Sequence, residues 1–178
     1  MVSRRRARSI PEPAAADTRH GAPPAVTPGG LAPFWERKPL EAMSPPEWEL
    51  LCDGCGKCCV HKIEDEDTGE LFYTDVSCRL LHPRTARCRD YPNRQLQVPD
   101  CIALTAADVA RYTWLPRSCA YRRLAEGRGL ADWHPLVSGD PESVHRRGVS
   151  VRGRVTPEDR LGAELIEDRV RDDLDRDL

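Results

Sequence analysis

The sequence predicts a small α+β domain, rich in cysteine, with short helices and a β-hairpin behind a disordered N-terminal extension. Three observations lead to this prediction. Every aromatic residue lies between Phe34 and Trp133, which places the packed core there because aromatic side chains supply much of the burial in small domains. Helix-start signals and β-prone runs follow one another within that stretch. Four of the eight cysteines fall within residues 52–59.

Composition divides the chain into three segments. Residues 1–33 combine prolines, alanines and glycines with no hydrophobic period, so we expect a disordered Arg/Pro-rich extension. Residues 34–155 are expected to form the cysteine-cluster domain. Residues 156–178 are expected to form a C-terminal helix that fades into an acidic tail, and we find no internal repeat.

The first predicted helix begins at Ser44. Serine is a favourable N-cap, Pro45 suits the first helical position, and Glu47 completes a capping box. The helix would lead through Leu51 straight into Cys52. Its packing would therefore fix the direction from which the chain enters the cysteine-rich stretch.

The following elements are predicted from local patterns. Two β-prone runs, 60–63 and 71–76, flank an acidic turn that ends in glycine, which is typical of a hairpin. Further helices are expected to start at Thr105 and at residues 115–119, because capping and proline signals precede apolar residues there. Residues 149–152 form a candidate strand, and Thr156 is expected to cap the C-terminal helix.

Cys52, Cys55 and Cys58 recur every third residue. This spacing lets a tight loop aim three sulfurs at one point. Gly54 and Gly56 permit the positive φ angles that such a loop needs, and backbone N–H groups would then turn towards the sulfurs and stabilise thiolate charge. The bacterial iron–sulfur run uses the same C-x2-C-x2-C spacing for three of its ligands. The stretch therefore predicts a metal or cluster loop, with buried unligated thiols as the alternative.

The other cysteines extend the candidate site. Cys59 follows Cys58 directly, so the two thiols point in different directions and one could serve a second site. Cys119 falls at the start of the predicted third helix, and could be a ligand, a reactive thiol or a small core residue. Three more cysteines lie beside turns, as suits ligands delivered from separate loops. The candidate metal ligands are Cys52, Cys55, Cys58, Cys59, Cys78, Cys88, Cys101 and Cys119.

Charge and hydropathy restrict the location and the partners. The net charge of −2 implies no overall attraction to nucleic acid or to an anionic membrane. No segment reaches the apolar length of a membrane span, and no hydrophobic signal region follows the N-terminal arginines. We expect a cytoplasmic protein whose thiols stay reduced, with a protein partner of unknown identity. In that compartment, eight cysteines favour metal binding over a disulfide framework, and metal would stabilise a modest core.

Beyond these local signals, the sequence resembles the bacterial CxxCxxCC cysteine-cluster family, described as a zinc- or iron-chelating domain, and within it the YcgN-like UPF0260 branch. Coverage runs from about Phe34 to Arg154. The resemblance is carried by the cysteines and by the segments Phe34-Trp35-Glu36, Glu47–Cys59, Asp65–Thr68, Val76–Arg79, Pro99-Asp100-Cys101, Trp114-Leu115-Pro116, Cys119–Arg122, Leu124–Gly127 and Trp133–Leu136. It implies a chelated metal and names no activity.

Three functions are compatible with these residues. The first is an iron–sulfur cluster or iron held by Cys52, Cys55 and Cys58, used for electron transfer or redox sensing. The fourth ligand would be Cys78, Cys88 or Cys101. The second is structural zinc that supports a protein-interaction module. Zinc patterns usually pair two C-x-x-C knuckles and only one such stretch is present, which favours iron.

The third function is a metal-dependent enzyme of unknown reaction. In it, the metal or Cys119 would be catalytic, and His134, His145 or Asp140 would carry protons. No H-E-x-x-H, nucleophile elbow, Walker loop or GxGxxG pattern is present. The sequence leaves the question of enzymatic activity open.

Overall fold

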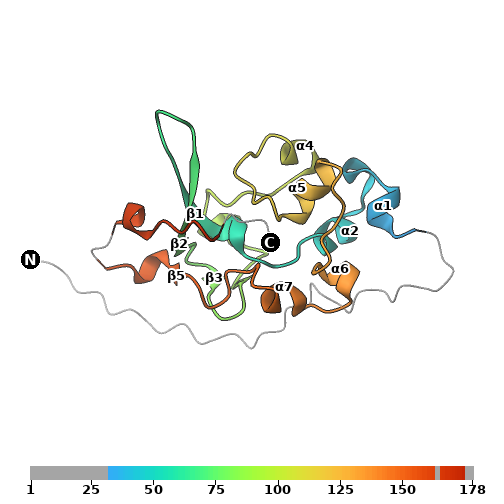
Figure 1. The fold of residues 1–178 in the computed structure, drawn as a ribbon. Coiled ribbons are helices and arrows are strands. Elements are labelled where there is room, and N and C mark those ends of the chain that lie inside the picture. The colour runs from blue at the N-terminus through green and yellow to red at the C-terminus, as the bar shows by residue number, and fades with distance from the viewer. Residues whose placement is uncertain (1–31, 163–164, 175–178) are drawn as a thin grey trace, which may run out of the picture.

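The computed structural model describes residues 32–162 and 165–174 and confirms a small α+β architecture. Its helical part is made of single turns and two-turn segments joined by long loops (Figure 1). The α-helices are α1 (Phe34–Arg37), α2 (Pro45–Leu50), α3 (Arg94–Gln97), α4 (Ala106–Val109), α5 (Ala120–Ala125), α6 (Pro135–Ser138) and α7 (Ser143–Arg146). The 3-10 turns are η1 (Leu40–Ala42), η2 (Lys57–Cys59), η3 (Glu158–Arg160) and η4 (Ile166–Arg169). None of the helices in the described part of the chain is long and apolar enough to traverse a bilayer.

Helix α2 begins as its sequence predicts. A Glu47 carboxylate oxygen accepts hydrogen bonds from the Ser44 backbone N–H and hydroxyl at 2.8 Å each, so the capping box is formed. Lys38 donates to the same carboxylate at 2.7 Å. These hydrogen bonds lower the pKa of Glu47 to about 2, and the bond from Lys38 has the largest effect. The helix entrance is therefore well specified, immediately upstream of the cysteine-rich stretch.

The strands form a three-stranded sheet and a small separate ladder. Strands β1 (Val60–Glu64) and β2 (Leu71–Ser77) are antiparallel, and the predicted hairpin between them projects from the body of the molecule (Figure 1). Strand β5 (Thr156–Pro157) pairs parallel to the other edge of β2. Strands β3 (Leu81–His82) and β4 (Arg87–Cys88) make the second ladder.

Three clusters of buried side chains make up the core. A helical cluster consists of Leu40, Leu51, Val109, Leu115, Tyr121 and Leu136. A sheet cluster consists of Val60, Tyr73, Leu81, Ala86, Val151 and Leu174. A third cluster consists of Cys55, Ala131, Trp133, Val144 and Val149. Within ten residues the chain contributes Leu51 to the first, Cys55 to the third and Val60 to the second, so the cysteine-rich stretch lies where the three clusters meet.

Some element predictions are wrong, because tertiary contacts outweigh local signals there. Thr156 does not cap a helix. It pairs with Val76 in β5, and the segments that follow are the 3-10 turns η3 and η4. Residues 149–152 form no strand; the Val151 N–H instead donates to the Cys55 carbonyl at 2.8 Å. Helix α5 begins one residue after Cys119, which is its N-cap, whereas the helix predicted at Thr105 is confirmed as α4.

The predicted domain boundaries and tails remain predictions. Most of the extension expected over residues 1–33 lies outside the described residues, and so does the end of the acidic tail.

Candidate metal centre

The cysteine loop, defined here as residues 52–59, turns sharply at its two glycines. Gly54 and Gly56 have φ angles of +74° and +76°, a conformation that glycine adopts without the penalty a Cβ atom would bring. Gly56 also has no room for a side chain, because a Cβ there would lie 2.8 Å from Val151. A Cβ at Gly54 would lie 2.4 Å from the Arg87 guanidinium carbon, the end of a flexible side chain that can move aside. Both glycines therefore serve the turn, and Gly56 also serves the close packing of the loop.

Asp53 braces the loop from within. Its side chain is 4% exposed, and its carboxylate accepts the Cys55 backbone N–H at 2.9 Å. This is an Asx-type turn, in which an aspartate side chain replaces a backbone partner two residues on. The bond fixes the backbone between Cys52 and Cys55 and places a negative charge beside their thiols.

His134 anchors the start of the loop. Its Nε2 donates to the Leu51 carbonyl at 3.0 Å, and its Nδ1 accepts the Leu136 N–H at 3.1 Å. The side chain is 1% exposed, so both ring nitrogens are used in a buried structural link. Of the other proposed proton carriers, His145 bonds Ser150 at 2.7 Å and Asp140 pairs with Arg146.

Two lysines place positive charge beside the loop. Lys57 is 2% exposed, and its Nζ donates to the Ser118 hydroxyl at 3.4 Å. The Nζ of Lys62 donates to three carbonyls of this region, those of Lys57 at 3.2 Å, Cys58 at 3.3 Å and Val60 at 2.7 Å. The same Nζ lies 5.1 Å from the ring centres of Tyr73 and Trp114. These cations can offset the charge of thiolates bound to a metal.

The loop thiols influence one another electrostatically. The pKa of Cys52 is raised to about 12, mainly by burial and to a smaller extent by the charge of Cys58. Burial also raises the pKa of Cys55 well above its usual value, with contributions from Asp53, Cys58 and Cys119. The Sγ atoms of Cys58 and Cys59 are 3.8 Å apart, and this contact is the main reason that the pKa of Cys58 is raised. The Cys58 residue itself is exposed to solvent.

Cys119 belongs to the same electrostatic neighbourhood. Burial raises its pKa to about 12, and the charges of Asp53 and Cys58 act in the same direction. The backbone N–H groups of Arg122 and Tyr121 donate to its sulfur and oppose the shift. A residue 61 positions beyond Cys58 along the chain thus comes close to the loop.

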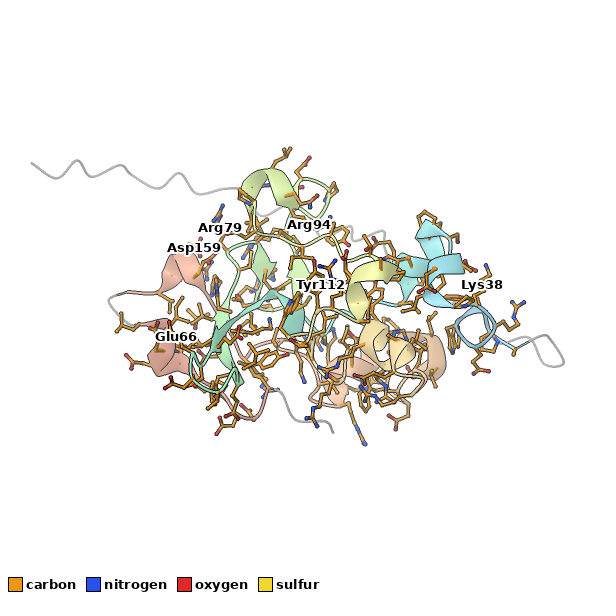
Figure 2. All side chains as sticks on the ribbon, turned by 90° about the horizontal axis from the view of Figure 1, so that it is seen from above. Lys38, Glu66, Arg79, Arg94, Tyr112 and Asp159 are labelled. Atoms are coloured by element: carbon orange, nitrogen blue, oxygen red, sulfur yellow. The ribbon has the colours of Figure 1, made fainter. Side chains whose placement is uncertain are left out.

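Cys78 and Cys101 form a second neighbourhood, called here the outer thiols. The pKa of Cys78 is raised by burial, then by the charges of Glu158 and Cys101, while the Leu80 N–H at 3.5 Å lowers it. Arg79 donates to the Gln97 carbonyl and thereby ties the segment of Cys101 to that of Cys78. Figure 2 shows Arg79 near Asp159, at the end of the molecule opposite Lys38.

The remaining two predicted ligands occupy the sheet region. Cys59 packs against the sheet cluster, and its carbonyl accepts the Cys78 N–H at 2.9 Å. Cys88 lies in β4, opposite Leu81. All eight cysteines are free thiols. With the side chains as they stand in residues 32–162 and 165–174, no three His, Cys, Asp or Glu residues are arranged to hold a metal ion.

Several supporting residues were not anticipated from the sequence. Asp53 could have been found from the Asp-Gly turn signal. Lys57 and Lys62 give no such signal, because a lysine beside a cysteine cluster is as readily solvated as buried. The link between His134 and Leu51 spans 83 positions, and nothing local predicts it.

Comparisons with known proteins relate the chain to bacterial UPF0260 proteins. Residues 51–120 match the CxxCxxCC family, described as "Putative zinc- or iron-chelating domain". A UPF0260 protein of Rhizorhabdus wittichii is 60% identical over 133 residues, which cover 75% of this chain and 91% of that protein. For UPF0260 proteins of Rhodopseudomonas palustris and Sinorhizobium medicae the identities are 56% over 138 residues (77% and 81% covered) and 57% over 139 residues (78% and 90% covered). No solved structure matches the chain.

Proposed function

The chain belongs to the UPF0260 family, and from that premise we propose that it holds an iron–sulfur cluster through the cysteine loop. The matched domain supports metal chelation by residues 51–120 and leaves the choice between zinc and iron to experiment. The function proposed for the cluster is electron transfer or redox sensing, in the cytoplasm.

One observation carries the choice of ligands. Three thiols spaced three residues apart lie on a loop whose glycines have the left-handed conformation and whose backbone is braced by a buried aspartate. A set of three ligands from one loop and a fourth from elsewhere matches the ligand pattern of iron–sulfur proteins. A zinc site more often combines two C-x-x-C pairs.

The surroundings support a charged centre. Four thiolates around a cluster or metal carry net negative charge, which is costly to bury without compensation. Lys57 and Lys62 supply positive charge next to the loop. Cys58 is exposed to solvent, so the centre would lie close enough to the surface to exchange electrons with a partner protein.

The test is metal analysis of protein purified without oxygen. Iron, zinc and acid-labile sulfide are measured per chain, and the visible spectrum is recorded. We expect a brown protein with stoichiometric iron and sulfide. A colourless protein with stoichiometric zinc would replace the cluster by the zinc alternative, a structural site supporting protein interaction.

Cys55→Ser tests the loop itself. Cys55 is buried, so the change removes a ligand without exposing new surface. We expect loss of the bound metal and a less cooperative unfolding transition, with chelator-treated wild-type protein as the control for metal-free folding. Unchanged metal content would contradict the loop assignment.

A further inference from the structure

We infer that Cys119 supplies the fourth thiolate to the centre formed by Cys52, Cys55 and Cys58, and that the outer thiols Cys78 and Cys101 lie outside it. The inference rests on the proposed metal-binding function and deepens it. The sequence led us to expect the fourth ligand from Cys78, Cys88 or Cys101, and the inference takes Cys119 in their place, with Cys88 decided by the experiment below.

The first argument is a bond between the two segments. Lys57 lies inside the cysteine loop, and Ser118 directly precedes Cys119. The Lys57 Nζ donates to the Ser118 hydroxyl, and both side chains are buried, at 2% and 4% exposure. At 3.4 Å the bond is long, but it shows that the two buried side chains lie against each other, so the segment of Cys119 packs on the loop.

The second argument is the packing of α5 on α2. The Tyr121 hydroxyl donates to the Trp48 carbonyl at 2.9 Å, and the two rings lie 4.6 Å apart. Helix α2 ends just before Cys52, and α5 begins just after Cys119. Both cysteines pack against the same helical cluster. The contact therefore places the two thiols on neighbouring elements.

The third argument is the way the backbone of Cys119 is held. The Cys119 carbonyl accepts the Arg123 N–H at 2.8 Å, and the Cys119 N–H donates to the Pro116 carbonyl at 2.9 Å. The backbone is thus fixed on both sides of Cys119, at the N-cap of α5.

The outer thiols have different neighbours. The Leu80 N–H donates to the Cys78 Sγ at 3.5 Å, and the Cys78 N–H donates to the Cys59 carbonyl at 2.9 Å, so Cys78 lies on the sheet side of the loop, beside Cys59. Arg79 donates to the Gln97 carbonyl, and its backbone N–H donates to Glu158 at 3.0 Å. These contacts tie the segments of Cys78 and Cys101 to each other and to η3.

The experiment compares Cys119→Ser with Cys78→Ser and Cys101→Ser, all in the full chain purified without oxygen. We expect Cys119→Ser to lose iron and sulfide as Cys55→Ser does, while the two outer variants keep wild-type content and spectrum. Zinc affinity of the metal-free proteins gives a second measure. Loss of a direct ligand should exceed the roughly 10–100-fold loss typical of changes outside the ligand shell.

A measurement on the unaltered protein guards against a folding defect in Cys119→Ser. The metal-loaded chain is treated with a thiol-alkylating reagent, and peptides are analysed by mass spectrometry. We expect Cys52, Cys55, Cys58 and Cys119 to be protected by metal and the outer thiols to react equally with and without it. Metal-dependent protection of Cys78, Cys88 or Cys101 in place of Cys119 would overturn the inference while leaving the proposed function intact. Retention of metal by Cys55→Ser would instead overturn the proposed function.

Discussion

The loop thiols and the outer thiols lie in one small protein but are held by contacts of different strength. Buried hydrogen bonds connect the loop and the preceding Leu51 to three distant segments, those of His134, Ser118 and Val151. Cys78 is bonded to Cys59 through its backbone N–H, and the segment of Cys101 is tied to that of Cys78 by Arg79, whose side chain is 46% exposed. Buried bonds tolerate little displacement, whereas exposed ion pairs contribute little and can rearrange.

This difference suggests which thiols form a defined centre. A metal site needs ligands held close to their final geometry before the metal arrives. The loop has that support from its glycines, its internal aspartate and the buried Lys57. Of the outer thiols, Cys78 has a backbone bond to Cys59, while the segment of Cys101 is linked to that of Cys78 through the partly exposed Arg79. The separation of the outer thiols from the loop centre can be tested by weakening each set of contacts in turn.

The largest expected effect is on metal affinity as pH changes. Burial raises the pKa of Cys52 and of Cys119 to about 12, so both thiols are protonated in the metal-free chain near neutral pH and metal must displace the protons. Lower pH therefore favours the metal-free form. For each ligand thiol, the zinc affinity should rise about tenfold per pH unit, which makes about ten-thousandfold per pH unit for four thiols.

Competition with a chelator between about pH 6.5 and 7.5 measures this slope. Cys52→Ser should reduce it by about one power of ten per pH unit, and Cys101→Ser should leave it unchanged. An equal reduction in both variants would remove the distinction between the two sets of thiols.

The next largest effect is expected at His134. His134→Ala leaves the Leu51 carbonyl and the Leu136 N–H buried without this partner, and each unsatisfied group costs about 1–3 kcal/mol. We expect the free energy of unfolding to fall by about 3 kcal/mol in urea titrations of the metal-free protein. His145→Ala is the control and should cost about 1 kcal/mol, since it removes a single hydrogen bond to Ser150. Similar costs for the two histidines would show that the loop anchor is unimportant.

Gly56→Ala tests the close packing of the loop. The added Cβ would lie 2.8 Å from Val151 in a backbone conformation with φ of +76°. Gly153 has a similar φ of +74° and no neighbour within 4 Å of a Cβ, so Gly153→Ala measures the backbone cost alone, about 1 kcal/mol. Gly56→Ala should cost about 1–3 kcal/mol more because of overpacking. Equal thermal midpoints for the two variants would contradict the packing argument.

The smallest effect is expected at Arg79. Arg79→Ala removes exposed contacts to Gln97 and Glu158, so the free energy of unfolding should fall by less than about 1 kcal/mol. Metal content should stay at the wild-type value. A marked loss of metal in this variant would mean that the outer thiols take part in the centre after all.

The sequence was informative where the determining contacts are local. The capping box at Ser44, the hairpin of 60–64 and 71–77 and the glycines of the cysteine loop depend on residues a few positions apart, and the structure has them as expected. It was misleading at Thr156 and Val151, because a strand edge and a loop carbonyl distant in sequence determine those conformations. The pairing of Cys119 with the loop has the same origin. It depends on bonds across 61 and 73 positions, those of Lys57 to Ser118 and of Trp48 to Tyr121, which no spacing rule contains.

The position of Lys62 has one more consequence. Its ammonium group lies over the indole of Trp114 while it binds carbonyls of the loop. The electric field of a nearby cation shifts the emission of an indole, and movement of the loop carbonyls would move that cation. The emission wavelength of Trp114 should therefore shift when the loop thiols bind metal, so that its fluorescence reports on the loop.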